Sequence, residues 1–160
     1  MEIPKPTKEH EFLRRFVGEW TIESTADMGP ELGEVTTHGT DSGRMLGDLW
    51  IVCEGGGEMP GCGSEAHNLM VVGFDTVKNK FVGNWIGSMM TMQWVYEGEL
   101  DETGNKLSLQ SEGPSMEKEG EYGKYNDVYE FLSDDHRTLT SFFEKDGEWV
   151  QFMQAHYYKK

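Results

Sequence analysis

The stretch Phe81-Val-Gly-Asn-Trp-Ile-Gly-Ser-Met-Met-Thr-Met-Gln-Trp-Val-Tyr96 predicts the fold of this chain. It divides into two strands, residues 80–87 and 91–100, joined by a tight apolar turn around Ser88-Met89-Met90. Two consecutive strands joined by a short turn form an antiparallel hairpin.

Large apolar side chains alternate along both strands of this hairpin. Met92, Trp94 and Tyr96 point one way in the second strand, and Phe81 and Trp85 share a face of the first. A period of two is typical of a half-buried antiparallel strand. The hairpin therefore predicts a wall of large, adaptable side chains and carries no evident reaction machinery.

Turn residues divide the rest of the chain at regular intervals. The glycine-rich segment 55–63 and the acidic segment 113–123 are predicted as loops. Regularly spaced strands of this kind close into a barrel or pack as a sandwich, and a barrel removes exposed edges. We expect an all-β barrel of about ten strands in one domain, residues 1–160. The further predicted strands are 19–24, 35–45, 49–53, 68–74, 106–111, 125–132, 137–144 and 149–158.

A short helix is predicted ahead of the first strand. Residues 1–5 form a loose tail, and the helix spans 7–17 with Thr7 as its N-cap. Phe12, Leu13, Phe16 and Val17 make one apolar stripe, and Gly18 ends the helix.

Charge and cysteine content limit the partners and the compartment. The chain has 14 basic and 29 acidic residues, a formal net charge of −15. Such a surface repels phosphate backbones and anionic lipids, so we expect no nucleic acid and no membrane partner. No basic segment followed by an apolar run opens the sequence, and Cys53 and Cys62 are its only cysteines. We expect a cytoplasmic protein with two free thiols.

Two sets of motifs resemble known families. Gly18-Glu-Trp20 at the start of the first strand resembles the Gly-x-Trp signature of the calycin superfamily, which holds lipocalins, fatty-acid-binding proteins and nitrobindin-type haem proteins. Longer motifs resemble the lipocalin-like domain of unknown function 1579. The resemblance implies a closed antiparallel barrel and no agreed activity. These motifs are His10-Glu11-x-Leu13, Val17-Gly-Glu-Trp20, Glu58-Met-Pro60, Gly83-x-Trp-Ile-Gly-Ser-Met-Met90, Trp94-Val-Tyr-Glu-Gly98, Asp135-His-Arg-Thr-Leu-Thr140 and Met153-x-Ala-His-Tyr157.

A small barrel either fills its interior or encloses one small ligand. Methionine and aromatic side chains suit an adaptable apolar pocket, and a few polar groups would orient an amphipathic molecule. We expect non-catalytic binding of a small hydrophobic or amphipathic ligand, with a filled core acting as a protein–protein module as one alternative. The residues predicted to bind the ligand in the barrel interior are Trp20, Phe81, Trp85, Met92, Trp94, Tyr96, Tyr125, Asp127 and His156.

Haem or metal binding is the other alternative. By alternation His156 shares a face with Phe152 and Tyr158, and nitrobindin-type proteins also place a haem-ligating histidine late in the chain. No other cofactor is expected. A non-haem metal would draw on scattered residues that lack the spacing of known zinc motifs, namely His38, His67, Asp41, Asp127, Cys53 and Cys62.

Catalysis and self-association are weaker hypotheses. Asp41 with Arg44, or Asp127 near Tyr125, would supply polar groups inside a barrel, but such pairs commonly serve as structural networks. No Gly-x-Ser-x-Gly elbow, phosphate loop or dinucleotide fingerprint is present. We therefore predict no catalytic residue, and we expect a monomer or a homodimer docking through Phe142, Phe143 and Tyr157.

Overall fold

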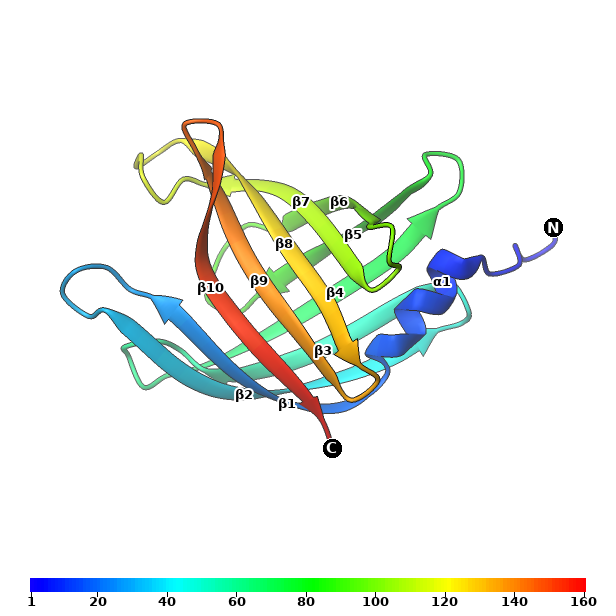
Figure 1. Cartoon of the computed structure of the whole chain (residues 1–160), viewed down its shortest axis with the longest axis horizontal. Coiled ribbons are helices and arrows are strands. Elements are labelled where there is room, and N and C mark those ends of the chain that lie inside the picture. The colour runs from blue at the N-terminus through cyan, green and yellow to red at the C-terminus, as the bar shows by residue number, and fades with distance from the viewer.

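The structure, a computed structural model describing residues 1–160, is a closed barrel of antiparallel strands (Figure 1). Each strand pairs with the next along the chain, and β1 pairs with β10 to close the cylinder. The predicted fold class is confirmed. The strands are β1 (Gly18–Asp27), β2 (Glu34–Leu46), β3 (Trp50–Glu58), β4 (Glu65–Asp75), β5 (Lys80–Gly87), β6 (Trp94–Leu100), β7 (Lys106–Pro114), β8 (Tyr122–Ser133), β9 (His136–Lys145) and β10 (Glu148–Lys159).

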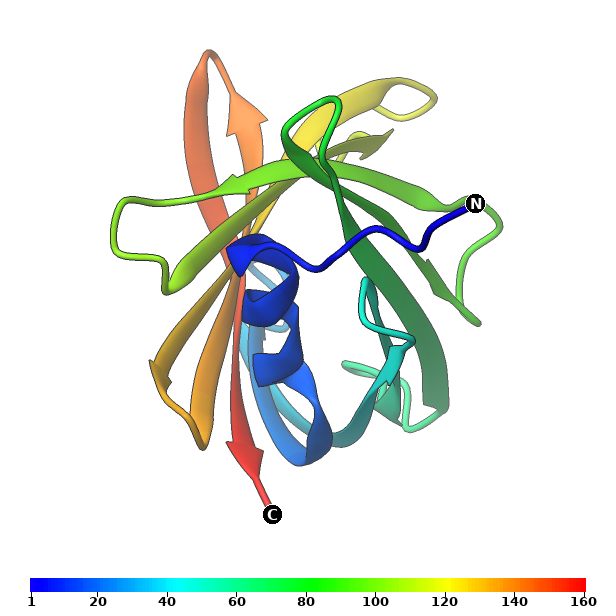
Figure 2. The same ribbon diagram turned by 90° about the vertical axis from the view of Figure 1, so that its right-hand side faces the viewer.

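One short helix lies across one end of the barrel (Figure 2). α1 (Lys8–Leu13) continues into a 3₁₀ turn, η1 (Arg14–Phe16). Thr7 is the N-cap, and its backbone N–H donates to Nδ1 of His10 over 2.9 Å. The helix is shorter than predicted because Val17 is already extended, and Gly18, at φ +125°, begins β1.

Three strands extend into segments predicted as loops. Gly55–Gly57 belong to β3, and the ends of β7 and β8 take up part of segment 113–123. A Cβ at Gly56 would lie 2.5 Å from the carbonyl oxygen of Ala66, and one at Gly57 equally close to that of His38. These glycines let neighbouring backbones approach closely as the sheet coils, a role of glycine inside strands. The prediction that residues 55–57 are loop was wrong for this reason.

The predicted hairpin of residues 80–100 is confirmed, but its connection is longer. β5 ends at Gly87 and β6 begins only at Trp94, so 88–93 form the loop. Met92 therefore lies in the loop, outside the strand alternation that placed it inward.

The barrel interior is packed solid at the end that α1 covers. Trp20, Phe16 and Phe81 are each at most 1% exposed there. The ring of Phe131 packs edge-to-face against those of Phe12, Phe16 and Trp20. Burial of such aromatic rings contributes a large share of the stability of a small domain. The helix thus plugs this end.

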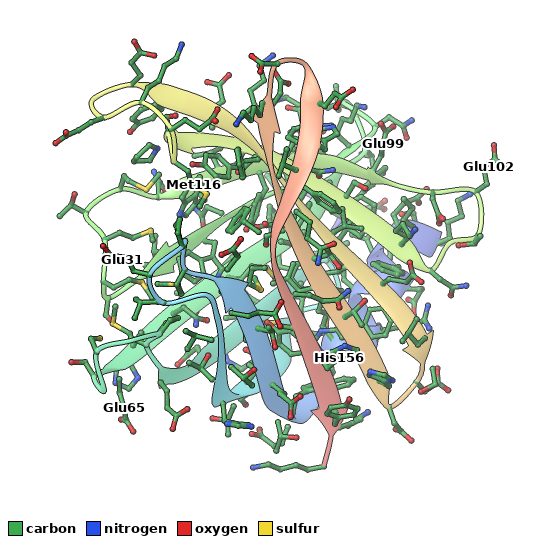
Figure 3. All side chains as sticks on the ribbon, turned by 60° about the vertical axis from the view of Figure 1, so that its left-hand side comes forward. Glu31, Glu65, Glu99, Glu102, Met116 and His156 are labelled. Carbon is green, nitrogen blue, oxygen red and sulfur yellow. The ribbon has the colours of Figure 1, made fainter.

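The strand order places five loops at the opposite end. The loops after β1, β3, β5, β7 and β9 all lie there, and Figure 3 labels Glu31, Glu65 and Met116 at that end. No helix of the chain has the length and apolar character needed to cross a membrane.

Candidate ligand-binding cavity

A cavity of about 420 Å³ occupies the half of the barrel away from α1. Inward side chains of most strands line it, together with loop residues at its mouth. Its volume lies within the range of small-molecule sites, roughly 300–1,000 Å³. Its apolar wall includes Ile22, Trp85, Trp94, Leu139, Phe152 and Met153.

Three aromatic rings, Trp94, Tyr125 and Phe152, stand together toward the mouth; we call them the aromatic trio. The ring centroids of Trp94 and Tyr125 are 4.9 Å apart, and those of Tyr125 and Phe152 are 6.1 Å apart, both edge-to-face. The Tyr125 hydroxyl donates to the carbonyl of Pro114, which fixes that ring. Indole Nε1 of Trp94 donates to Sδ of Met90 over 3.0 Å, so a loop methionine rests on the trio.

A carboxylate lies deeper, below the trio. Asp127 follows Tyr125 by two residues on β8 and faces the same side. Its Oδ1 accepts a hydrogen bond from the Ser141 hydroxyl over 2.7 Å, and its Oδ2 accepts one from the Tyr96 hydroxyl. Neighbouring β6 and β9 supply these two donors, so the barrel itself holds the carboxylate in place.

Burial changes the ionisation of this cluster. It raises the pKa of Asp127, against the lowering effect of the hydrogen bonds from Tyr96 and Ser141. It also raises the pKa of Tyr96 well above its usual value, and the neighbouring Asp127 carboxylate adds to that rise. The Tyr96 hydroxyl therefore stays protonated as a donor, and burial disfavours the charged form of Asp127.

An ion pair forms the floor between the cavity and the plugged end. Nη2 of Arg137 donates to Oδ2 of Asp41 over 3.0 Å. The guanidinium lies 4.4 Å from the ring centroid of Trp20 and 4.1 Å from that of Tyr157, and Arg137 is 1% exposed. Burial raises the pKa of Asp41 even though the Arg137 charge opposes it.

One polar group of the wall has no protein partner. The hydroxyl of Ser111 is buried, lines the cavity and makes no hydrogen bond. A buried hydroxyl without a partner is unfavourable, so a ligand or solvent group that bonds to it is stabilising.

The structure brings five of the predicted residues together in the cavity wall: Trp85, Trp94, Tyr96, Tyr125 and Asp127. Trp20 and Phe81 also point inward, but they lie in the plugged half and not in the cavity wall. Met92 lies in the β5–β6 loop and does not line the cavity.

His156 is placed differently from the prediction. A bulge between Gln151 and Met153 shifts the alternation of β10, so Ala155 and Tyr157 line the cavity and His156 points away from it. On the outer side its Nδ1 lies 2.9 Å from Nε2 of His136. The predicted interior position of His156 is wrong, and it does not suit a haem held inside the barrel.

Because of the same bulge, the prediction that Tyr157 lies on an outer docking face is wrong. Its ring lines the cavity instead. Phe142 does lie on an outer groove with Trp149, and Phe143 packs against Phe152 with ring centroids 6.0 Å apart. The oligomeric state stays a prediction.

The sequence reasoning missed Met89, Met90, Ser141 and Tyr157. The two methionines belong to the β5–β6 loop and line the cavity from there. Their place in an apolar turn was the signal in the sequence that could have indicated this. Ser141 carries no local pattern, because only the β8–β9 register places it opposite Asp127.

The metal candidates do not gather. No three His, Cys, Asp or Glu side chains approach closely enough to hold an ion. Cys53 is buried and Cys62 exposed, and both are free thiols. Burial raises the pKa of Cys53 to about 12.

A closed antiparallel barrel, plugged at one end by a short helix and hollow at the other, defines a lipocalin-like protein. Solved structures share this fold. Rv2717c from M. tuberculosis is 10% identical with a TM-score of 0.69 over 98% of this chain and 99% of its own. The S-type phycobiliprotein lyase CPES from Guillardia theta is 14% identical with a TM-score of 0.57 over 98% of both chains. EF1p2_mFAP2b bound to DFHBI is 11% identical with a TM-score of 0.51 over 95% of this chain and 99% of its own.

The chain belongs to the family described as protein of unknown function (DUF1579), whose model matches residues 5–159. The resemblance seen in its motifs is thereby confirmed. No curated protein matches the chain.

Proposed function

We propose that this protein binds a small hydrophobic or amphipathic molecule in the hollow half of its barrel, without chemical change. The single observation that carries the proposal is the cavity of about 420 Å³. A barrel with a purely structural role gains stability by filling its interior, because voids lose dispersion contacts. The half plugged by α1 is filled, whereas the other half keeps its space.

The wall chemistry supports an amphipathic occupant. The aromatic trio and nearby methionines offer a broad, polarisable apolar surface. Asp127 and the free hydroxyl of Ser111 supply a small number of polar groups. A mostly apolar wall with few polar groups is typical of small-molecule sites.

Two solved barrels of similar fold are compatible with this proposal. EF1p2_mFAP2b is described as bound to DFHBI, a small molecule, and CPES is described as a phycobiliprotein lyase. At 11% and 14% identity these proteins share the fold with this chain. They support the capacity of such a barrel to hold a ligand and name no ligand for this one.

Titration with Nile red, a neutral dye whose emission depends on polarity, tests the proposal. We expect saturable enhancement and a blue shift with the wild-type protein. Ala26→Trp places an indole in the cavity wall and should weaken dye binding at least about tenfold. Thr25→Trp is the matched control, because neighbouring strand residues face opposite sides and Thr25 contacts Thr36 outside.

Equal dye binding by Ala26→Trp and Thr25→Trp, both folded by circular dichroism, would place the dye on the outer surface and refute the cavity as the site. Wild-type protein that gives no saturable signal would refute it as well.

A further inference from the structure

We infer that the cavity selects a hydrophobic organic cation, such as an aryl-alkyl ammonium, with the cationic nitrogen at Asp127 and the apolar part against the aromatic trio. This inference rests on the proposed binding function and specifies its ligand class.

No lysine or arginine lines the cavity. Apart from the tyrosine hydroxyls, the ionisable side chains among its lining residues are Asp41, Asp127, Glu58 and His38. The side chain of His38 is 65% exposed and lies within 4.0 Å of both Glu23 and Glu58, on the face of β2 that alternates with the cavity-lining Thr37 and Gly39. A carboxylate ligand would thus meet acidic groups and no interior cation, a like-charge arrangement that costs affinity.

Arg137, the one buried guanidinium, does not supply that cation. Its Nη2 is paired with Asp41 at 3.0 Å, while Nε and Nη1 are buried without a hydrogen-bond partner. Trp20 and Tyr157 cover its faces, and it is 1% exposed. A ligand carboxylate would have to displace this packing to reach it.

Asp127, in contrast, is accessible from within. It lines the cavity and is only partly buried. Each of its oxygens accepts one hydroxyl hydrogen bond and retains a further acceptor position. An ammonium donating there makes a charge-assisted hydrogen bond, which is stronger than one between neutral groups. It also stabilises the charged form of Asp127, which the surrounding barrel disfavours.

The geometry suits a ligand with a cationic head and an aromatic body. β8 runs from the mouth toward α1, so Tyr125 lies nearer the mouth and Asp127 one inward step deeper. Two residues along a strand span about 6.6 Å, the length of a short arylalkyl group. Aromatic faces attract organic cations as well, so the trio does not oppose the charge on its way in.

Ser111 supplies an independent sign of an occupant. Its hydroxyl is buried and unpartnered, Ser111 is 8% exposed, and its strand position pairs with Tyr125. It offers a second hydrogen-bonding position beside the trio for a polar group of the ligand.

The mouth has the matching charge. Among residues of the five loops at this end, Lys118 is the only basic side chain, whereas Glu31, Glu117, Glu119, Glu121 and Asp146 are acidic. An acidic rim raises the local concentration of cations and the rate at which they bind.

Three probes that share the naphthalene ring system and differ in charge test the inference by calorimetry at neutral pH: naphthylmethylamine, naphthylmethanol and naphthaleneacetate. We expect the protonated amine to bind at least about tenfold more tightly than the alcohol, and the carboxylate to bind most weakly. Asp127→Asn should remove the preference for the amine while the alcohol still binds. Glu97→Gln, which removes the same charge from the outer face of β6 next to Tyr96, should keep it.

The outcomes separate the two proposals. Alcohol binding that equals or exceeds amine binding in the wild-type protein overturns the cationic ligand class and leaves the binding function standing. If no probe binds and Nile red does not bind either, both fail. Because the wild-type comparison needs no variant, a misfolded Asp127→Asn protein would not rescue the inference.

Discussion

Replacing Gly113 by alanine should close part of the cavity with little loss of stability. Gly113 lies on the inner face of β7, under the ring of Trp94. A Cβ there would lie within 2.9 Å of three carbon atoms of that ring, whereas carbon atoms pack best at about 3.5–4.0 Å. The indole must therefore withdraw by roughly 1 Å or more, and the space open to it is the cavity.

The expected energetic effect is small because two contributions oppose each other. Displacing the ring and its hydrogen bond to Met90 costs about 1–3 kcal/mol, the usual cost of overpacking. Alanine in place of glycine inside a strand returns about 0.5–1 kcal/mol. We expect the free energy of unfolding of Gly113→Ala to fall by about 1 kcal/mol, and Nile red affinity to fall at least about fivefold as Trp94 fills the site.

Gly98→Ala is the matched control. A Cβ at Gly98 would lie within 3.0 Å of backbone atoms of Ser108 and Leu109, which cannot withdraw without breaking the β6–β7 ladder. We expect it to lose about 3 kcal/mol or more. Urea unfolding followed by circular dichroism gives both values. If Gly113→Ala is as unstable as Gly98→Ala, or binds dye like wild type, Trp94 has no free space beside it and the reasoning is refuted.

Three further predictions concern ionisation, packing and thiol access. Burial raises the pKa of Asp127 in the folded state. Its favourable contribution to the free energy of unfolding is therefore complete below its unfolded pKa of about 3.9, and it is lost as pH rises through the pKa of the folded state. The melting temperature of Asp127→Asn relative to wild type should therefore increase from about pH 4 upward, and a constant difference would contradict this. Phe16→Ala should lower the free energy of unfolding by about 3–5 kcal/mol in urea titrations, because the ring is 1% exposed in the plugged half; a loss under 1 kcal/mol would show a core that collapses around the gap. DTNB should label Cys62 at once and Cys53 only after denaturation, because Cys53 is 3% exposed and its pKa is raised to about 12; two fast thiols in native protein would contradict its burial.

Local patterns in the sequence were enough for the elements and the fold class. Alternation over residues 80–87 and 125–132 and turn residues between them identify strands, because the period of two depends only on the chain itself. They missed the β-structure of Gly55–Gly57, where flexibility was inferred from composition. The glycines let β3 lie close to its neighbours β2 and β4, and this requirement cannot be seen in any single segment.

Alternation along regular strands was sufficient to identify inward-facing side chains: Trp85, Trp94, Tyr96, Tyr125 and Asp127 all line the cavity. Alternation gives the face of a residue but not its depth along the barrel axis. Depth decides that Trp20 and Phe81 pack under α1 while the others surround open space, and it depends on how every strand is staggered against its neighbours.

The remaining features of the site depend on contacts between strands, which local patterns do not contain. The bulge in β10 turned His156 outward and Tyr157 inward, because one extra residue reverses every later position. Register between β8 and β9 set Ser141 against Asp127. Such pairings join residues remote in sequence, and their energies belong to the closed barrel as a whole.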